Sequence, residues 1–131
     1  MSNTNASDIT EKGRRIALVI GVNEAPNSHL VPLSHAAADA EAVAEVLQQH
    51  CNFELLEPPL VNEQATSDRV KDAVRRLARN RSADDFLLLY FSGHGQPMFI
   101  EAERRDIYLA TNNFSEIDVE EDEATHFSMR W

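Results

Sequence analysis

Two short runs of apolar and aromatic residues, at positions 16–20 and 86–91, limit the folds that this chain can adopt. Successive side chains of a strand point to opposite faces, so a run that is apolar throughout must be covered on both faces. Strands of this kind lie inside parallel sheets that have helices on each side. We therefore expect residues 16–20, which are closed by Gly21, and residues 86–91 to form central strands buried on both faces.

Two helical patterns lie between these strands. The first begins after Ser34, which can cap the free N–H groups of a helix, and ends near His50; its apolar face is Ala36, Ala40, Val43 and Leu47. The second begins at Thr66 or Ser67 and is basic in its second half, where cations suit the helix dipole; its apolar face is Val70, Val74 and Leu77. The order β-α-β-α-β predicts parallel strands joined by right-handed crossovers.

Shorter apolar segments complete the pattern. Residues 53–56 break at Pro58 and Pro59, as an edge strand would. Residues 98–100 and 107–110 fit a small hairpin. The sequence thus supplies three parallel strands and a hairpin.

The C-terminal part of the chain has a weaker pattern. Residues 115–123 are expected to form an acidic loop, and an amphipathic segment begins at 127–131. A doubly wound sheet has about five strands, and no segment here covers the far edge of the 86–91 strand. We expect an α/β domain that is incomplete at its C-terminus.

The composition describes one globular domain. The chain has 131 residues, of which we assign 13–131 to a single core and the polar residues 1–12 to a disordered tail. A net charge of -10 disfavours nucleic acid and acidic membrane surfaces as partners, and no apolar run is long enough to span a bilayer. The single Cys51 excludes an internal disulfide, and the N-terminus has no signal-peptide pattern, so a cytoplasmic location is expected.

A turn of sequence Ser92-Gly93-His94-Gly95 directly follows the second apolar strand. In open parallel sheets, functional groups gather beyond the carboxyl ends of the strands, where this turn and the loop at 21–34 both lie. The glycines on either side of the imidazole leave the backbone N–H groups unobstructed. This arrangement suits a general base beside an oxyanion site, although position alone does not distinguish it from an ordinary turn.

Residues 87–95 carry a family resemblance when they are taken with residues 16–23 and the helix around 37–40. Together these segments resemble the N-terminal part of the caspase-like cysteine peptidases, and they look closest to the bacterial caspase-like and metacaspase branches. Residues 107–111 are similar to the short strand that follows the histidine turn in the bacterial members. The resemblance implies a three-layer αβα fold, the caspase-hemoglobinase fold, with a mainly parallel sheet.

The resemblance also implies a cysteine endopeptidase that acts on protein or peptide substrates. It makes His94 the general base and acid, and it gives the N–H of Gly95 a place in the oxyanion hole. The family's nucleophilic cysteine ends the next strand, which would lie beyond residue 131. We therefore expect the chain to be inactive alone and to need the C-terminal remainder of the domain or a companion fragment.

Cys51 is not expected to replace that nucleophile. The first helix runs back from the carboxyl edge of the sheet, so its last turn carries Cys51 to the opposite edge, about 15 Å or more from His94. We interpret Cys51 as a buried or half-buried structural thiol.

The sequence carries only weak signals for substrate specificity and for ion binding. In the animal caspases, an arginine in the loop between the first strand and the first helix helps to bind the substrate aspartate, whereas the loop at 22–35 has no Arg or Lys. With this departure, the resemblance implies a preference for basic residues, as in metacaspases, over aspartate; we assign no role to Glu24. His29 and His35 lack metal-ligand spacing, so no metal or cofactor is assigned. Residues 116–123 hold six acidic side chains and leave calcium open as an activator.

Two other functions stay open at this point. One is a non-catalytic caspase-like module that binds proteins through its open strand edge or its charged surfaces. The other is an unrelated flavodoxin-like binding domain. A polypeptide that continues beyond Trp131 into an apolar strand ending in a cysteine favours the peptidase over the module.

Overall fold

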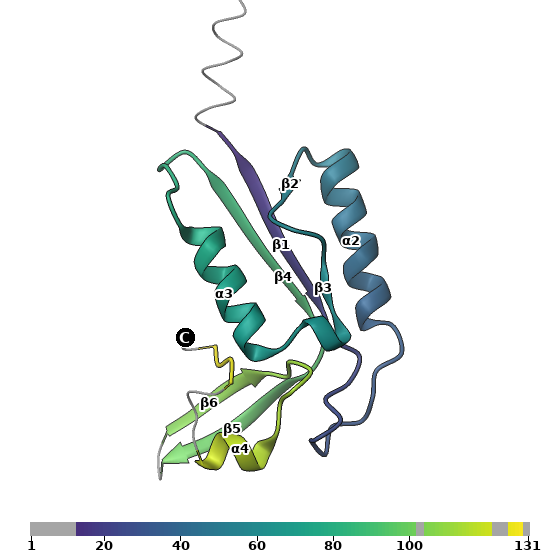
Figure 1. Cartoon of the computed structure of the whole chain (residues 1–131), viewed down its shortest axis with the longest axis vertical. Coiled ribbons are helices and arrows are strands. Elements are labelled where there is room, and N and C mark those ends of the chain that lie inside the picture. Colours follow the sequence, from purple (N-terminus) through teal and green to yellow (C-terminus); the bar gives the residue numbers. More distant parts are fainter. Residues whose placement is uncertain (1–12, 102–103, 122–125, 130–131) are drawn as a thin grey trace, which may run out of the picture.

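The computed structural model describes residues 13–101, 104–121 and 126–129 (Figure 1). In chain order the elements are β1 (Arg15–Gly21), α2 (Ala36–His50), β2 (Glu54–Leu55), β3 (Leu60–Val61), the 3-10 turn η1 (Asn62–Gln64), α3 (Ser67–Ala78), β4 (Phe86–Ser92), β5 (Gly95–Glu101), β6 (Arg104–Leu109) and α4 (Glu116–Glu121). The tail assigned to residues 1–12 lies outside the described residues. Within the described part of the chain, no helix is long and apolar enough to cross a bilayer.

β1 is the central strand of the main sheet. It pairs in parallel with β4 over its whole length, from Arg15 opposite Phe86 to Gly21 opposite Ser92. The other edge of β1 pairs first with β2 and then with β3, also in parallel. Residues 56–59, which include both prolines, stand opposite only two residues of β1, so the edge strand is interrupted where the sequence predicts a break.

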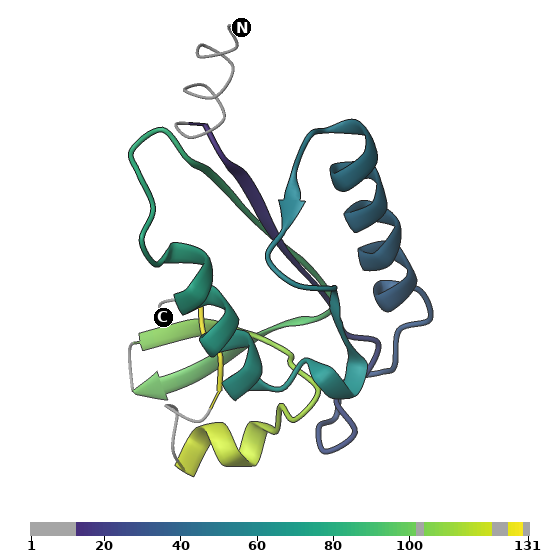
Figure 2. The ribbon, with the colours of Figure 1, turned by 45° about the horizontal axis from the view of Figure 1, so that its top comes forward.

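The side chains of β1 are buried on both faces, as predicted. Ile16, Leu18 and Ile20 pack with residues of α3, whereas Ala17 and Val19 pack with residues of α2. Each of these five side chains is at most 1% exposed. The two helices therefore cover opposite faces of β1, as Figure 2 shows.

β4 is a strand, as predicted, but the prediction that both its faces are buried is wrong. Phe86, Leu87 and Leu89 are 54%, 37% and 44% exposed. Among the described residues β4 pairs only with β1, and Leu88 and Tyr90 are the side chains that pack toward α2. An apolar run predicts a strand, but it does not by itself place that strand in the middle of a sheet.

α3 begins where the sequence predicts. The Thr66 hydroxyl caps the helix by accepting a hydrogen bond from the Arg69 N–H at 3.4 Å. Its basic side is partly neutralised within the chain, because Arg76 contacts Glu57 at 2.6 Å and Asp72 at 2.9 Å. These ion pairs reduce the positive charge that α3 presents to solvent.

α2 ends at His50 as predicted, but Ser34 does not cap its start. The cap comes from farther away in the sequence: the side-chain oxygen of Asn23 accepts a hydrogen bond from the Ala37 N–H at 2.9 Å. A donor at the first turn of a helix needs an acceptor, and any nearby side-chain oxygen can supply it. The first turn of α2 is thus fixed to the residues that follow β1.

β5 and β6 form the predicted antiparallel hairpin. A third extended segment runs beside β6, because the Leu109 N–H donates to the Phe127 carbonyl at 3.0 Å and the Met129 N–H donates to the Ile107 carbonyl at 2.8 Å. Phe127 is buried in the cluster beneath α3. The hairpin is therefore anchored to the main core at the end of the sheet where β1 and β4 finish (Figure 1).

The acidic loop expected at 115–123 is in part a helix, α4. Val119 is 2% exposed and packs in a third apolar cluster with Tyr108 and Phe114. One buried apolar position among the acidic ones is enough to hold this turn of helix against the hairpin. Residues 122–125 of the predicted loop lie outside the described residues.

Gly21 lies directly against α2, and substituting it tests this packing. A Cβ at this position would lie 2.6 Å from the Ala40 Cβ and 2.7 Å from the Ala36 carbonyl oxygen. We expect Gly21→Ala to reduce the free energy of unfolding by about 1–3 kcal/mol, measured by urea denaturation. Gly95→Ala is the control, because its Cβ would have no contact closer than 3.5 Å. Equal stability of both variants would contradict the packing described here.

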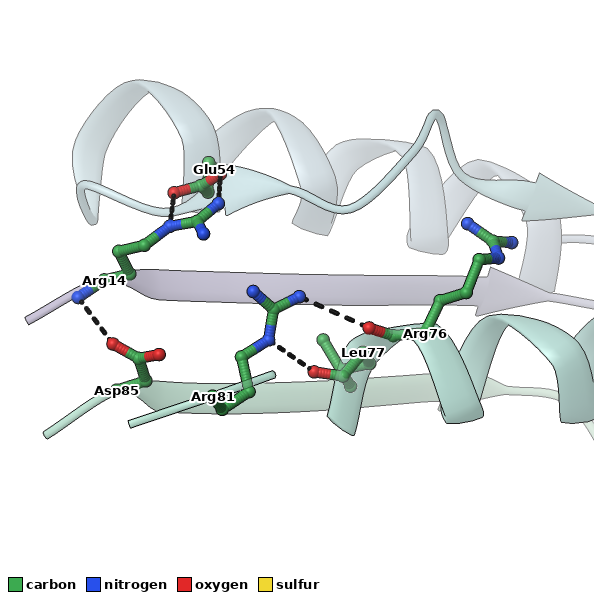
Figure 3. A network of polar contacts seen from close by, with 6 residues as sticks. All are labelled: Arg14, Glu54, Arg76, Leu77, Arg81 and Asp85. Carbon is green, nitrogen blue, oxygen red and sulfur yellow. Dashed lines mark hydrogen bonds and ion pairs between the residues drawn. The ribbon is translucent and has the colours of Figure 1, made fainter. Parts of the chain in front are cut away.

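Arg14 joins β1 to its two neighbours at the amino end of the sheet (Figure 3). Its guanidinium contacts Glu54 at 2.7 and 3.0 Å, and its backbone N–H donates to Asp85 at 3.3 Å. The hydrogen bond from Arg14 lowers the pKa of Glu54, and the backbone N–H of Ser82 lowers the pKa of Asp85. These groups are exposed, so salt weakens their interaction.

The lowered pKa values predict an acid-sensitive contribution to stability. A carboxylate with a depressed pKa stabilises the fold above its ordinary value, 4.5 for Glu54, and this contribution is lost as the pH falls through the depressed value. We therefore expect Arg14→Met to be less stable than the wild type at pH 7 and the difference to narrow below about pH 4. Urea denaturation at pH values from 7 to below 4 measures the free energy of unfolding of both proteins. Arg79→Met, which changes another exposed arginine, is the control. A difference that stays constant with pH would refute this role of Arg14.

Candidate functional site

The loops after β1 and β4 leave the sheet at the same edge. Gly21 and Ser92 are register partners at the ends of their strands, and the Val22 N–H extends the ladder by donating to the Ser92 carbonyl at 2.9 Å. The loop at 23–35 and the turn at 93–95 therefore start side by side. This is the edge where the sequence predicts functional groups to gather.

His94 contacts the loop that follows β1. Its Nε2 atom lies 2.7 Å from the backbone carbonyl oxygen of Val31, and the imidazole is half-buried. A carbonyl oxygen can only accept a hydrogen bond, so this contact assigns the proton to Nε2. In the neutral ring, Nδ1 is then the nitrogen with a free lone pair, which is the property that a general base needs.

The backbone of the histidine turn is held from both sides. On one side, a Cβ on Gly93 would lie 2.9 Å from the Phe91 ring and 3.2 Å from the Val22 carbonyl oxygen, so the close packing favours glycine. On the other side, the His94 carbonyl accepts a hydrogen bond from the Ala110 N–H at 2.9 Å. The imidazole therefore stands on a turn fixed between the main sheet and the hairpin.

Gly95 is the first residue of β5 and is exposed to solvent. It is the register partner of Leu109 in the hairpin, next to the His94 carbonyl that Ala110 holds. The predicted pair His94 and Gly95 thus lies at the open carboxyl edge of the sheet.

Cys51 lies at the other end of the sheet, as predicted. It follows α2, and its carbonyl accepts a hydrogen bond from Nε of Arg15, the first residue of β1, at 3.2 Å. The seven residues of β1 span roughly 20 Å between that end and the edge that carries His94. Cys51 is half-buried and packs against the apolar cluster that includes Ala44 and Leu47 of α2, so its predicted half-buried position is confirmed.

The weaker candidates do not converge on an ion site. Glu24 and His29 are exposed in the loop after β1; the Glu24 carbonyl accepts a hydrogen bond from Asn112, and the His29 N–H donates to Glu116. His35 is the residue before α2. Among the residues that the structure describes, no three His, Cys, Asp or Glu side chains are grouped as metal ligands. The acidic stretch 116–123 lies partly outside them.

Sequence reasoning missed the Val31 carbonyl. A backbone acceptor gives no residue-type signal, and the side chain of Val31 is 73% exposed, as in an ordinary loop. No signal in the sequence singles out one loop carbonyl as the partner of His94. The structure supplies that partner from a loop 63 residues away in the sequence.

The position of Cys51 predicts that its reactivity is independent of His94. We expect the rate of Cys51 alkylation by iodoacetamide in the folded protein to be the same in the wild type and in His94→Ala, because roughly 20 Å separates the two ends of β1. Intact mass spectrometry over time measures the rate, and unfolded protein in urea supplies the reference for a fully accessible thiol. A large change in the alkylation rate of Cys51 in the His94→Ala variant would contradict this independence.

Comparison with known proteins agrees with this geometry. Residues 14–127 match the family model described as the caspase domain, and this range includes both core strands, both main helices, the loop that holds Val31 and the histidine turn. No curated protein sequence matches the chain. Because the match extends over most of the 131 residues, the chain belongs to the caspase-domain family.

Proposed function

We propose that the chain is the histidine-bearing part of a cysteine endopeptidase of the bacterial caspase-like or metacaspase kind. The observation that supports it best is the 2.7 Å contact between His94 Nε2 and the Val31 carbonyl, at the carboxyl edge of the sheet. That contact leaves Nδ1 to take the proton of a cysteine thiol. The resulting thiolate attacks the substrate carbonyl carbon, and the imidazolium then protonates the leaving amine.

The second component of the proposed site is the backbone N–H of Gly95. Negative charge develops on the carbonyl oxygen as the thiolate attacks, and an N–H donor near that position stabilises it. One such donor contributes about 3–4 kcal/mol in well-studied hydrolases. The exposure of Gly95 beside His94 is consistent with this role.

The nucleophile is proposed to come from a segment beyond residue 131 or from a companion fragment. The open edge of β4 offers a place for it, because Phe86, Leu87 and Leu89 are exposed there. A strand added in parallel along β4 would end at the same edge as Ser92, and its last residues would approach His94. Further chain packed over Leu87 and Leu89 would complete the three-layer αβα fold.

The substrate is proposed to be a protein or peptide with a basic residue before the scissile bond. The loop at 22–35 carries Glu24 but no arginine or lysine that would pair with an aspartate, and the net charge of -10 also favours cationic substrates. We further propose a cytoplasmic enzyme that needs no resident cofactor. Calcium bound by the acidic stretch 116–123 is the candidate activator.

Substitution of His94 tests this function in the protein from its native cells. The protein is recovered through an N-terminal tag, and its mass is measured under denaturing and native conditions. We expect a mass above 14.7 kDa, or a 14.7 kDa chain bound to a second fragment with a reactive thiol. We also expect cleavage of peptides with arginine before the scissile bond to fall about 10²–10⁴-fold in His94→Ala.

His29→Ala is the matched control, because His29 is an exposed histidine in the loop beside His94 and its described hydrogen bond uses only the backbone. A lone 14.7 kDa species with no cleavage would refute the peptidase and leave a non-catalytic interaction module. Faster cleavage after aspartate than after arginine would refute the specificity alone.

A further inference from the structure

The carbonyl of Val31 can orient His94 only if its loop is held in place. Val31 lies in a segment without helix or strand, between β1 and α2. Its side chain is mostly exposed and gives the segment little anchorage. The position of the carbonyl must therefore be set by contacts elsewhere in the loop.

Asn23 makes three hydrogen bonds that close this loop. Its backbone carbonyl accepts from the Leu33 N–H at 2.7 Å, which joins the two ends of the segment that contains Val31. Its side-chain oxygen accepts from the Ala37 N–H at 2.9 Å, which fixes the loop to the first turn of α2. Its backbone N–H donates to the side-chain oxygen of Asn62 at 3.0 Å.

Asn62 extends this network to the far edge of the sheet. It directly follows β3 and has a φ of 51°, a left-handed conformation that asparagine tolerates better than most residues. Its backbone carbonyl also accepts a hydrogen bond from the Ala65 N–H at 2.8 Å. The side-chain oxygen that meets Asn23 is thus held on a fixed turn.

Contacts on the hairpin side support the loop from Glu24 to Leu30. The Glu24 carbonyl accepts a hydrogen bond from the Asn112 side chain at 3.3 Å, and Ala25 is buried in the third apolar cluster. The His29 N–H donates to Glu116 at 3.3 Å, and Leu30 packs against the third apolar cluster. These contacts restrain the loop in one direction. The closure of its two ends, and their attachment to α2, depend on Asn23.

We propose that Asn23 is a positioning residue that acts on His94 through the Val31 carbonyl, with Asn62 holding Asn23 in turn. Its side-chain oxygen fixes the loop so that the carbonyl stays on Nε2 and keeps the proton there. Loss of this oxygen detaches the loop from the first turn of α2, while the two backbone hydrogen bonds of Asn23 remain. The loop then holds the Val31 carbonyl less firmly, and the neutral imidazole also populates the tautomer with the proton on Nδ1. The chemical value of this control rests on the function proposed for His94.

The test measures the tautomer of His94 directly. In the 131-residue chain labelled with ¹⁵N, long-range ¹H–¹⁵N spectra at about pH 8.5, where histidine is neutral, distinguish protonated from unprotonated ring nitrogens. We expect His94 to carry its proton on Nε2 in the wild type. In Asn23→Ala the ratio of the two tautomers should fall by roughly fivefold, as expected for the loss of one hydrogen bond.

Three further variants keep the test decisive. Asn23→Asp retains the acceptor and should restore the wild-type tautomer, whereas Asn62→Gly keeps the left-handed backbone, loses the acceptor and should behave like Asn23→Ala. Thr66→Ala removes the equivalent cap from α3 and should lower stability without changing His94. An unchanged tautomer ratio in folded Asn23→Ala, or in Asn62→Gly if Asn23→Ala does not fold, would overturn the proposal.

This readout is separate from peptidase activity. If the tautomers respond as expected but no preparation cleaves peptides, the function proposed for His94 is wrong and the positioning by Asn23 stands. If His94→Ala abolishes cleavage and the tautomers do not respond, the positioning is wrong and the proposed function stands.

Discussion

Seven residues of β1 pair in parallel with seven residues of β4, and this ladder determines where every other element can lie. The connection from β1 to β2 and the connection from β3 to β4 run in opposite directions along the sheet, so right-handed crossovers place α2 and α3 on opposite faces of β1, where they bury its alternating side chains. The same pairing places Gly21 beside Ser92, so the loops that follow them start together. Strand register therefore brings together the two loops that carry Val31 and His94.

Most of the secondary structure follows from local patterns in the sequence. The burial of β1, the start of α3 at Thr66 and the break before β3 each depend on residues within one turn or one strand, and all three were predicted correctly. The errors involve partners at long range. Ser34 is close to α2 in sequence, but the acceptor that reaches Ala37 belongs to Asn23, 14 residues earlier. The exposure of β4 likewise depends on which strands lie beside it.

The candidate site shows the same division between local and distant information. The glycines around His94 and its place after a strand singled this residue out, but its catalytic role was implied only by the family resemblance. The distance of Cys51 followed from the direction of a helix. The partner of His94 was not predictable, because a backbone carbonyl is the same at every position and only the folded loop selects Val31. The helical conformation of α4 was not predicted, because a single apolar residue among acidic ones gives no clear pattern. That residue, Val119, is buried in the structure.

The two edges of the main sheet differ in their ability to accept another strand. Along β2 and β3, four residues that include Pro58 and Pro59 stand opposite two residues of β1, so that edge presents no continuous row of hydrogen-bonding groups. Along β4, seven uncharged residues form an uninterrupted edge. When β4 pairs with a strand of another molecule, the main sheet has no further edge that can accept a strand. Edge-to-edge association through the main sheet therefore ends at a pair of molecules.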